Sequence, residues 1–218
     1  MPILPLIFFF LMAMIMIATI QIHLFEIAFA KLGLTPETTL LLLIGTLIGS
    51  GINLPLFKIK SQESGHLVFT PGKRPVWEIY QPAREGWTVI AVNVGGCVIP
   101  VGLCLYFISL QLVNPVVLLL ATAAITALGF QMSRPVPGVG FGMPLFVAPL
   151  ASAALALLLD AEHAAHIAYV SGVLGVLIGA DILHLRQVGS LGVPVAAIGG
   201  AGTFDGIFLT GIIAALLA

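Results

Sequence analysis

The chain has 218 residues, of which 60% are hydrophobic and only 8% are charged. A soluble domain usually carries about 25% charged residues, so this chain could not cover its own surface in water and needs lipid as its solvent. The net charge of −1 indicates neither a nucleic acid nor an acidic partner. The composition therefore predicts an integral membrane protein in contact with the lipid bilayer.

Seven apolar stretches are long enough to cross about 30 Å of hydrocarbon, which predicts a single all-α domain of about seven transmembrane helices. No basic residue precedes the apolar N-terminal stretch, so we expect that stretch to be a retained span and not a removed signal peptide. Thr35-Pro36-Glu37 is a helix-start signature. The predicted spans lie near residues 3–20, 36–57, 87–110, 114–130, 144–159, 166–186 and 194–218.

A polar stretch at residues 58–86 holds five of the eight basic residues. Within it, two short runs flank Pro71-Gly72-Lys73-Arg74, which predicts a small β-hairpin over a turn. Lysine and arginine divide seven to one between the two sides of the predicted membrane topology, with only Lys31 on the minor side. The positive-inside rule then places this stretch and the N-terminus in the cytoplasm and the C-terminus outside.

Two aspartates lie inside the last two predicted spans, Asp181 in the sixth and Asp205 in the seventh. A carboxylate within a membrane is costly, by about 2.5–3.5 kcal/mol on insertion scales, and is a functional candidate by default. Consecutive spans are usually neighbours, so the two acids could meet. Two carboxyl groups about 3 Å apart cannot both ionise easily and share a proton, which suits one to activate water while the other protonates an amide carbonyl.

The residues around both aspartates carry a resemblance. Gly202-Thr-Phe-Asp205-Gly-Ile-Phe208 resembles the Gly-x-Gly-Asp-Phe-Ile-Phe segment of presenilins and signal peptide peptidases, and Asp181-Ile-Leu-His-Leu resembles the aspartate segment of their preceding span. In that family the two aspartates lie on spans six and seven, with a cytosolic loop between them. The predicted topology gives the same placement.

The chain also departs from the pattern of that family. Phe204 stands where the family has a glycine before the second aspartate, and Ala180 stands where it has a tyrosine before the first. The family's later spans, which carry a Pro-Ala-Leu motif, have no counterpart after the seventh stretch, and the candidate substitutes are Ala148-Pro149-Leu150 and Pro144-Leu145. The resemblance covers about 40 residues and implies a distant, compact relative from a prokaryotic membrane-protein family.

The resemblance implies an intramembrane aspartyl protease in a prokaryotic inner membrane, with Asp181 and Asp205 as the catalytic pair and a transmembrane peptide as substrate. The candidate substrate-binding residues are Gly202, Thr203, Gly206 and His184. Neither a metal nor an organic cofactor is expected, because two carboxyl groups and water suffice for this chemistry.

Two other functions fit the same residues. In a small proton-coupled transporter, the two acids would carry a proton or a cation, although no internal repeat of the kind common in carriers is visible. In a non-catalytic scaffold, Asp181 would pair with Arg186 or His184, while Asp205 would bond Thr203 or lie near a helix start.

Three other features are open to two interpretations each. Asp160-Ala-Glu-His163-Ala-Ala-His166 is a polar loop or, less well supported by its spacing, a metal site. Asn53 and Asn93, each beside glycines, mark helix breaks that line a site or polar groups that bond a neighbouring helix. Cys97 and Cys104 are about 10.5 Å apart along a helix axis, which is too far for a disulfide, so both are expected to be buried.

The segment before Asp205 is expected not to be helical. Pro194 biases the preceding residue toward an extended conformation, and Gly199, Gly200 and Gly202 weaken a helix by up to about 1 kcal/mol each. We predict that residues 193–198 are extended and that the seventh helix begins near residues 200–202. Asp205 would then lie in the first helical turn, at the depth of Asp181.

Overall fold

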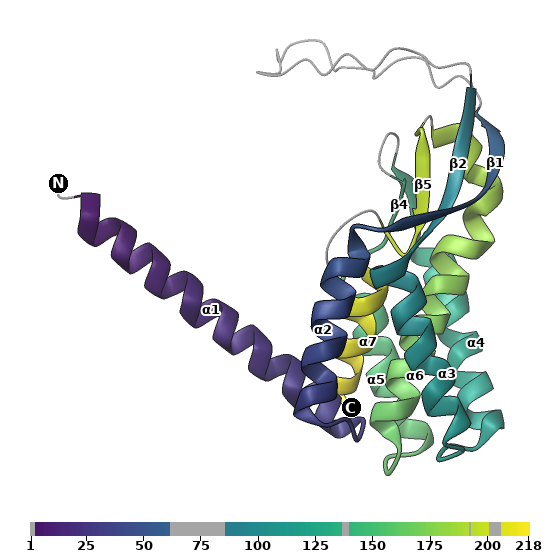
Figure 1. Cartoon of the computed structure of the whole chain (residues 1–218). Coiled ribbons are helices and arrows are strands. Elements are labelled where there is room, and N and C mark those ends of the chain that lie inside the picture. The colour runs from purple at the N-terminus through teal and green to yellow at the C-terminus, as the bar shows by residue number, and fades with distance from the viewer. Residues whose placement is uncertain (1–2, 62–85, 137–139, 192, 201–205) are drawn as a thin grey trace, which may run out of the picture.

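The computed structural model describes residues 3–61, 86–136, 140–191, 193–200 and 206–218. Figure 1 shows a bundle of helices with a small β-sheet at one end and the C-terminus at the other. The helices are α1 (Ile3–Lys31), α2 (Pro36–Ser50), α3 (Ile99–Ser109), α4 (Pro115–Met132), α5 (Val147–Leu159), α6 (Ala164–Val176) and α7 (Gly206–Leu217). Two π-helical turns, η1 (Val94–Val98) and η2 (Leu177–Asp181), and a 3₁₀ segment, η3 (Ile182–Leu191), complete the helical part.

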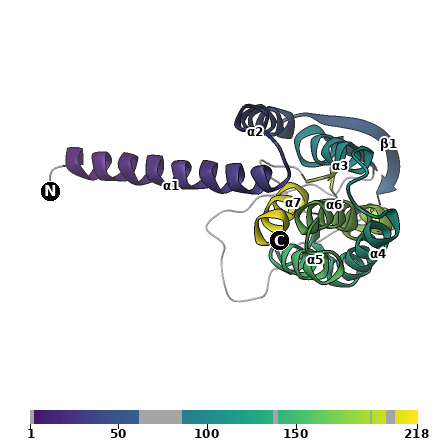
Figure 2. The same cartoon turned by 90° about the horizontal axis from the view of Figure 1, so that it is seen from below.

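Helix α6 forms the centre of the bundle. Ten of its thirteen residues are buried, and α3, α4, α5 and α7 surround it in the end-on view of Figure 2. The side chains that face away from α6 are apolar too, as at Leu119 (68% exposed) and Leu158 (84% exposed). Helices that are apolar on both their inner and outer faces are typical of a membrane environment.

Helix α1 diverges from the bundle and contacts it only near its C-terminal end (Figure 1). Ala28 and Phe29 are fully buried there, and the Lys31 Nζ donates a hydrogen bond of 2.9 Å to the Leu216 carbonyl. A tight turn then leads into α2, where the Thr35 side chain accepts a hydrogen bond from the Thr38 N–H. The predicted helix start at Thr35-Pro36 is confirmed.

Fewer of the described helices are long enough to cross a membrane than the sequence predicts. By length and composition, α4 and the continuous stretch Ala164–Leu191 can each cross a membrane alone. A third span is counted if the pair Met16–Lys31 and Pro36–Ser50, bent by 118°, forms one. The apolar helices Val94–Ser109, Val147–Leu159 and Gly206–Leu217 are shorter. The protein is thus a helical membrane protein, but the prediction of seven helical spans is wrong for the described residues.

A three-stranded sheet takes the place of helix in two of the predicted spans, and its third strand lies in the segment predicted to be extended. Strand β1 (Asn53–Ser61) pairs antiparallel with β2 (Gly86–Asn93), from Asn53 opposite Asn93 to Ser61 opposite Gly86. Strand β2 also pairs in parallel with β5 (Val195–Ile198). The ends of the spans predicted at 36–57 and 87–110 are therefore strands, because hydropathy alone does not distinguish an apolar strand from a helix.

The remaining predictions on local structure have mixed outcomes. The extended segment before α7 is confirmed as β5. Helix α7 is described from Gly206 onward, and the predicted start near residues 200–202 falls mostly outside the described residues. The hairpin predicted within residues 66–80 lies outside them entirely. A second small sheet pairs β3 (Arg134–Val136) with β4 (Gly140–Gly142).

Candidate functional site

Asp181 is the last residue of the π-helical turn η2, at the sheet end of the central helix α6. The turn lies close against α4, because a Cβ on Gly179 would meet the Thr126 carbonyl oxygen and the Phe130 backbone nitrogen. π-Helical turns are rare and frequently mark functional sites. Asp181 was predicted to lie in a regular helix. In the structure it lies in a π-helical turn and is half-buried.

The Asp181 carboxylate accepts a hydrogen bond from the chain that leads to Asp205. The Gly199 N–H donates to Asp181 Oδ2 over 3.0 Å, across 18 residues of sequence. Gly199 directly follows β5 and has a φ of 82°, in the left-handed region that favours glycine. This hydrogen bond joins the end of the sixth predicted span to the beginning of the seventh.

A second π-helical turn, η1, lies on the other side of Gly199. A Cβ on Gly199 would lie 2.6 Å from the Cβ of Cys97 and 2.8 Å from the Cys97 backbone nitrogen. Cys97 and Cys104 are both buried, as predicted. Two irregular turns from distant parts of the chain therefore lie around one glycine that bonds Asp181.

Asn93 holds η1 in place. Its Oδ1 accepts a 2.7 Å hydrogen bond from the Gly96 N–H, and its Nδ2 donates to the Ser50 carbonyl and to Asn53 Oδ1. The predicted helix breaks at Asn53 and Asn93 are confirmed, since each residue lies at a junction of helix and strand. Their hydrogen bonds join neighbouring segments, which supports the structural interpretation of the two asparagines.

His184 lies one turn beyond Asp181 and is 5% exposed. Its Nδ1 donates a 3.0 Å hydrogen bond to the Gly179 carbonyl. The His184 ring stacks on the Phe130 ring, with centroids 4.8 Å apart. It also contacts the Phe141 ring, which is tilted relative to it, at a centroid distance of 4.9 Å. The hydrogen bond with Gly179 gives His184 a structural role in η2, while a contact with substrate stays a prediction.

The other predicted site residues belong to the connection between β5 and α7. Gly202, Thr203 and Asp205 lie outside the described residues. Gly206 is the first residue of α7, and no heavy atom of the described residues lies within 4 Å of a Cβ built there. The described chain thus gives the positions of Asp181, Gly199 and the start of α7, and a meeting of Asp181 with Asp205 stays a prediction.

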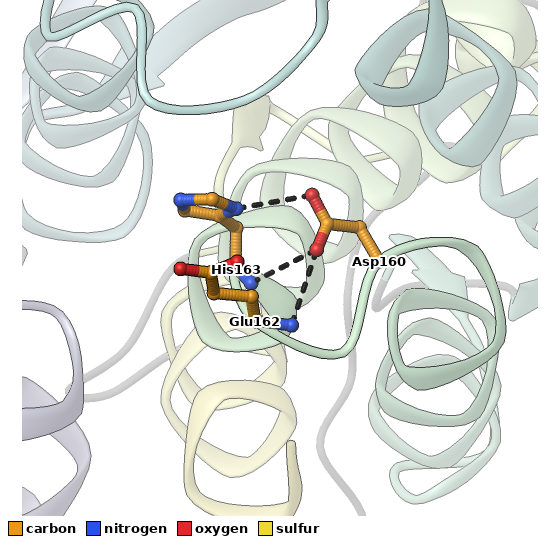
Figure 3. A network of polar contacts seen from close by, with 3 residues as sticks. All are labelled: Asp160, Glu162 and His163. Carbon is orange, nitrogen blue, oxygen red and sulfur yellow. Dashed lines mark hydrogen bonds and ion pairs between the residues drawn. The ribbon is translucent and has the colours of Figure 1, made fainter.

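The polar loop at the opposite end of the bundle forms a local network (Figure 3). Asp160 Oδ1 accepts hydrogen bonds from the Glu162 and His163 N–H groups, and Asp160 Oδ2 lies 3.0 Å from His163 Nδ1. The hydrogen bond from the His163 side chain is the main reason that the pKa of Asp160 lies below its ordinary value. Among the described residues, no group of three or more His, Cys, Asp or Glu side chains could hold a metal ion.

A largely apolar cavity of about 760 Å³ lies between α3, α4 and α6, at the end away from the sheet. Its lining includes Phe107, Gln111, Asn114, Leu118 and His166 but no carboxylate. It therefore offers no acid–base pair, and the site around Asp181 remains the better candidate for chemistry.

Residues 47–217 match the DUF1614 family, described as proteins of unknown function. The match covers more than half of the chain, so the chain belongs to this family. It includes both π-helical turns, the sheet and both aspartates, and it leaves out α1 and most of α2. No curated protein and no solved structure matches the chain.

Proposed function

We propose that this member of the DUF1614 family is an intramembrane aspartyl protease in which Asp181 and Asp205 hydrolyse a transmembrane peptide. The observation that carries the proposal is the 3.0 Å hydrogen bond from the Gly199 N–H to Asp181 Oδ2. Gly199 lies only six residues before Asp205, so this bond ties the segment that bears the second acid to the first acid.

The packing of the two helices supports the same arrangement. Helices α6 and α7 are neighbours with small residues at their contact: a Cβ on Gly211 would lie 2.9 Å from the Tyr169 ring, and one on Gly172 would lie 3.2 Å from Thr210. Such close approach keeps the start of α7 beside the end of α6. Asp205 directly precedes α7 in the sequence, so this packing supports the proposal that it lies near Asp181.

The proposed chemistry needs two carboxyl groups and a water molecule. One carboxylate takes a proton from water as the water attacks the scissile carbonyl carbon, while the protonated carboxyl donates to the carbonyl oxygen. The tetrahedral intermediate then collapses: the carboxyl that took the proton from water passes it to the leaving nitrogen, the C–N bond breaks, and the other carboxylate takes a proton from a hydroxyl of the intermediate, which restores the pair. Gly202 and Gly206 would let the substrate backbone approach, with Thr203 and His184 beside them.

Strand β5 supplies a place for an extended substrate. Within the described residues it pairs only with β2, so its other edge has backbone groups open to a further strand. In this proposal the protein is a multi-pass protein of a prokaryotic inner membrane, with the sheet and the N-terminus on the cytoplasmic side. The substrate enters from the bilayer.

A non-catalytic role also has a specific observation in its favour. A carboxylate that only stabilises the fold would make the same hydrogen bond with Gly199, because it caps the turn after β5. The two roles differ in what an amide does at position 181. Asparagine keeps the oxygen that accepts the Gly199 hydrogen bond and loses the acid–base group.

The experiment is cleavage of a reporter transmembrane peptide by the purified protein in vesicles. We expect Asp181→Asn and Asp205→Asn each to abolish cleavage, with a double variant little worse, because an acid–base pair acts as a unit. Asp160→Asn, on the outer loop, is the matched control and should cleave normally. Persistent cleavage in both single variants would refute the catalytic proposal. Retained folding of all variants is checked by circular dichroism and thermal unfolding.

A further inference from the structure

Two short apolar helices adjoin strands of one sheet, and a third follows a strand of that sheet in the sequence. Helix α2 leads into β1, β2 leads into η1 and α3, and β5 precedes α7. Helix α2 has 15 residues and is about 22 Å long, and α7 has 12 residues and is about 18 Å long. A hydrocarbon core of about 30 Å therefore leaves roughly 10 Å that the adjoining strands must cover if these segments cross it.

The exposed apolar surface continues from α2 onto β1 without interruption. It runs from Leu41 (71% exposed) and Ile48 (65%) to Leu54 (47%) and Leu56 (56%). No charged residue occurs between Glu37 and Lys58. At about 3.3 Å per residue and a tilt near 45°, about four strand residues cover the missing 10 Å. That count ends at Leu56, just before the first lysine.

Beyond this point the outer face of the sheet combines basic and aromatic side chains. Lys60 lies opposite Trp87 in the β1–β2 register, and Lys58 lies two residues away on the same face. Both lysines are exposed, and Trp87 is 58% exposed. Ile59, between the lysines, instead packs toward Val188 and Leu191. Tryptophan and lysine together are typical of the headgroup layer of a membrane.

The described charged side chains at the sheet end are basic, except for the half-buried Asp181. Among the described residues, β1, β2, β3 and η3 carry four basic side chains (Lys58, Lys60, Arg134 and Arg186) and no acidic one. Segment η3 contacts both β1 and β3, so these side chains belong to one end of the molecule. Such a cluster complements the phosphate groups of an anionic membrane leaflet.

We infer that the sheet crosses the membrane–water boundary and that Lys58, Lys60 and Trp87 bind the headgroups of anionic phospholipids. The half of β1 next to α2 lies among acyl chains and completes the span that α2 begins. A second copy of the chain would fit the outer edge of β1 less well. Pro55 has no N–H to donate, and the register shifts between Pro55 and Phe57, which both discourage pairing with another strand.

The test uses the fluorescence of Trp87. The chain has two tryptophans, and Trp77→Phe removes the other one. The full chain is reconstituted in vesicles of phosphatidylcholine and phosphatidylglycerol, with a trace of either lipid carrying a doxyl quencher near the headgroup. We expect stronger quenching from labelled phosphatidylglycerol than from labelled phosphatidylcholine. In the same background, Lys58→Gln and Lys60→Gln should each reduce this preference about fivefold, equivalent to about 1 kcal/mol.

Lys31→Gln, at the other end of the molecule, is the matched control and should leave the preference unchanged. Quenching of Trp87 by aqueous iodide but by neither lipid would overturn the inference, because the sheet would then stand in water. Equal quenching by the two labelled lipids in the parent protein would overturn the binding of anionic headgroups. Thermal unfolding of each variant in the same vesicles confirms that the sheet is intact.

Discussion

Each end of the helical bundle has an aspartate whose carboxylate accepts hydrogen bonds from the backbone, but one carboxylate has local partners and the other has a distant partner. Asp160, at the end away from the sheet (the outer end), accepts hydrogen bonds from the N–H groups of residues two and three positions ahead. Asp181, at the sheet end, bonds Gly199 across 18 residues. The first contact orders a loop, whereas the second connects two distant segments. A carboxylate held by distant segments in an irregular part of the fold is the stronger candidate for function.

The backbone differs between the two ends in the same way. The end away from the sheet has α-helices joined by short turns, in which Gly33 and Gln111 have a positive φ. The sheet end has two π-helical turns, a left-handed glycine and a parallel pair of strands. Because these features depend on contacts between distant residues, substitutions at the sheet end should cost far more stability than substitutions at the outer end.

The largest effect is expected at Gly95, inside η1. A Cβ there would collide with the Thr46 carbonyl oxygen and the Ser50 backbone of α2. Gly95→Ala should therefore lower the free energy of unfolding by about 3 kcal/mol or more, because neither backbone can yield easily. Gly102→Ala, in the adjoining α3, has open space around the new methyl group and should be neutral or stabilising by about 0.5–1 kcal/mol. Unfolding in mixed micelles measures both, and equal values would contradict the close packing of η1.

A smaller but substantial effect is expected at Gly199. Gly199→Ala combines a left-handed φ of 82° with a methyl group 2.6 Å from the Cys97 Cβ, and should cost about 2–3 kcal/mol. Gly33→Ala is the control, since Gly33 has a φ of 76° and no neighbour within 4 Å. It should cost only the backbone strain, about 1–2 kcal/mol. If Gly199→Ala were no worse than Gly33→Ala, the contact with η1 would be absent.

The smallest effect is expected at the outer loop and should depend on pH. The folded protein lowers the pKa of Asp160, so the unfolded chain binds a proton at this residue more readily. The stabilisation is therefore complete above about pH 4, the ordinary aspartate range, and is lost as the pH falls through the lower folded pKa. Asp160→Asn should remove this small acid-dependent part of the unfolding curve. An unchanged acid limb in that variant would contradict the role assigned to the Asp160–His163 network.

Local signals in the sequence predicted several of these features. Thr35 and Pro36 fix the start of α2, and Pro194 with the following glycines predicts the extended segment that is β5. Asn53 and Asn93 mark the junctions of helix and strand. In each case the cause is a side chain or a backbone preference within a few residues, which a single sequence contains.

Other features depend on partners far away in the chain. The pairing of Val89 with Val195 joins residues more than 100 positions apart, and no local pattern specifies it. The first part of β1, up to Phe57, and most of β2 were predicted as helix because their apolar residues continue the adjoining helices without a charge. Pro55 and the β-branched residues Thr88, Val89 and Ile90 were the available signals for strand. The π-helical turns follow from contacts such as that of Gly95 with α2, which only the folded chain reveals.

The proposed protease requires Asp181 and Asp205 to meet, and oxidative crosslinking tests this requirement directly. In a chain with Cys97→Ala and Cys104→Ala, the pair Asp181→Cys and Asp205→Cys should form a disulfide, which requires Cα atoms within about 7 Å. Val89→Cys with Val195→Cys, which are partners in the sheet, is the positive control. Asp160→Cys with Asp181→Cys, from opposite ends of α6, is the negative control. Rapid crosslinking of positions 181 and 205 is the predicted result, and its absence while the sheet pair crosslinks would contradict a shared acid–base site.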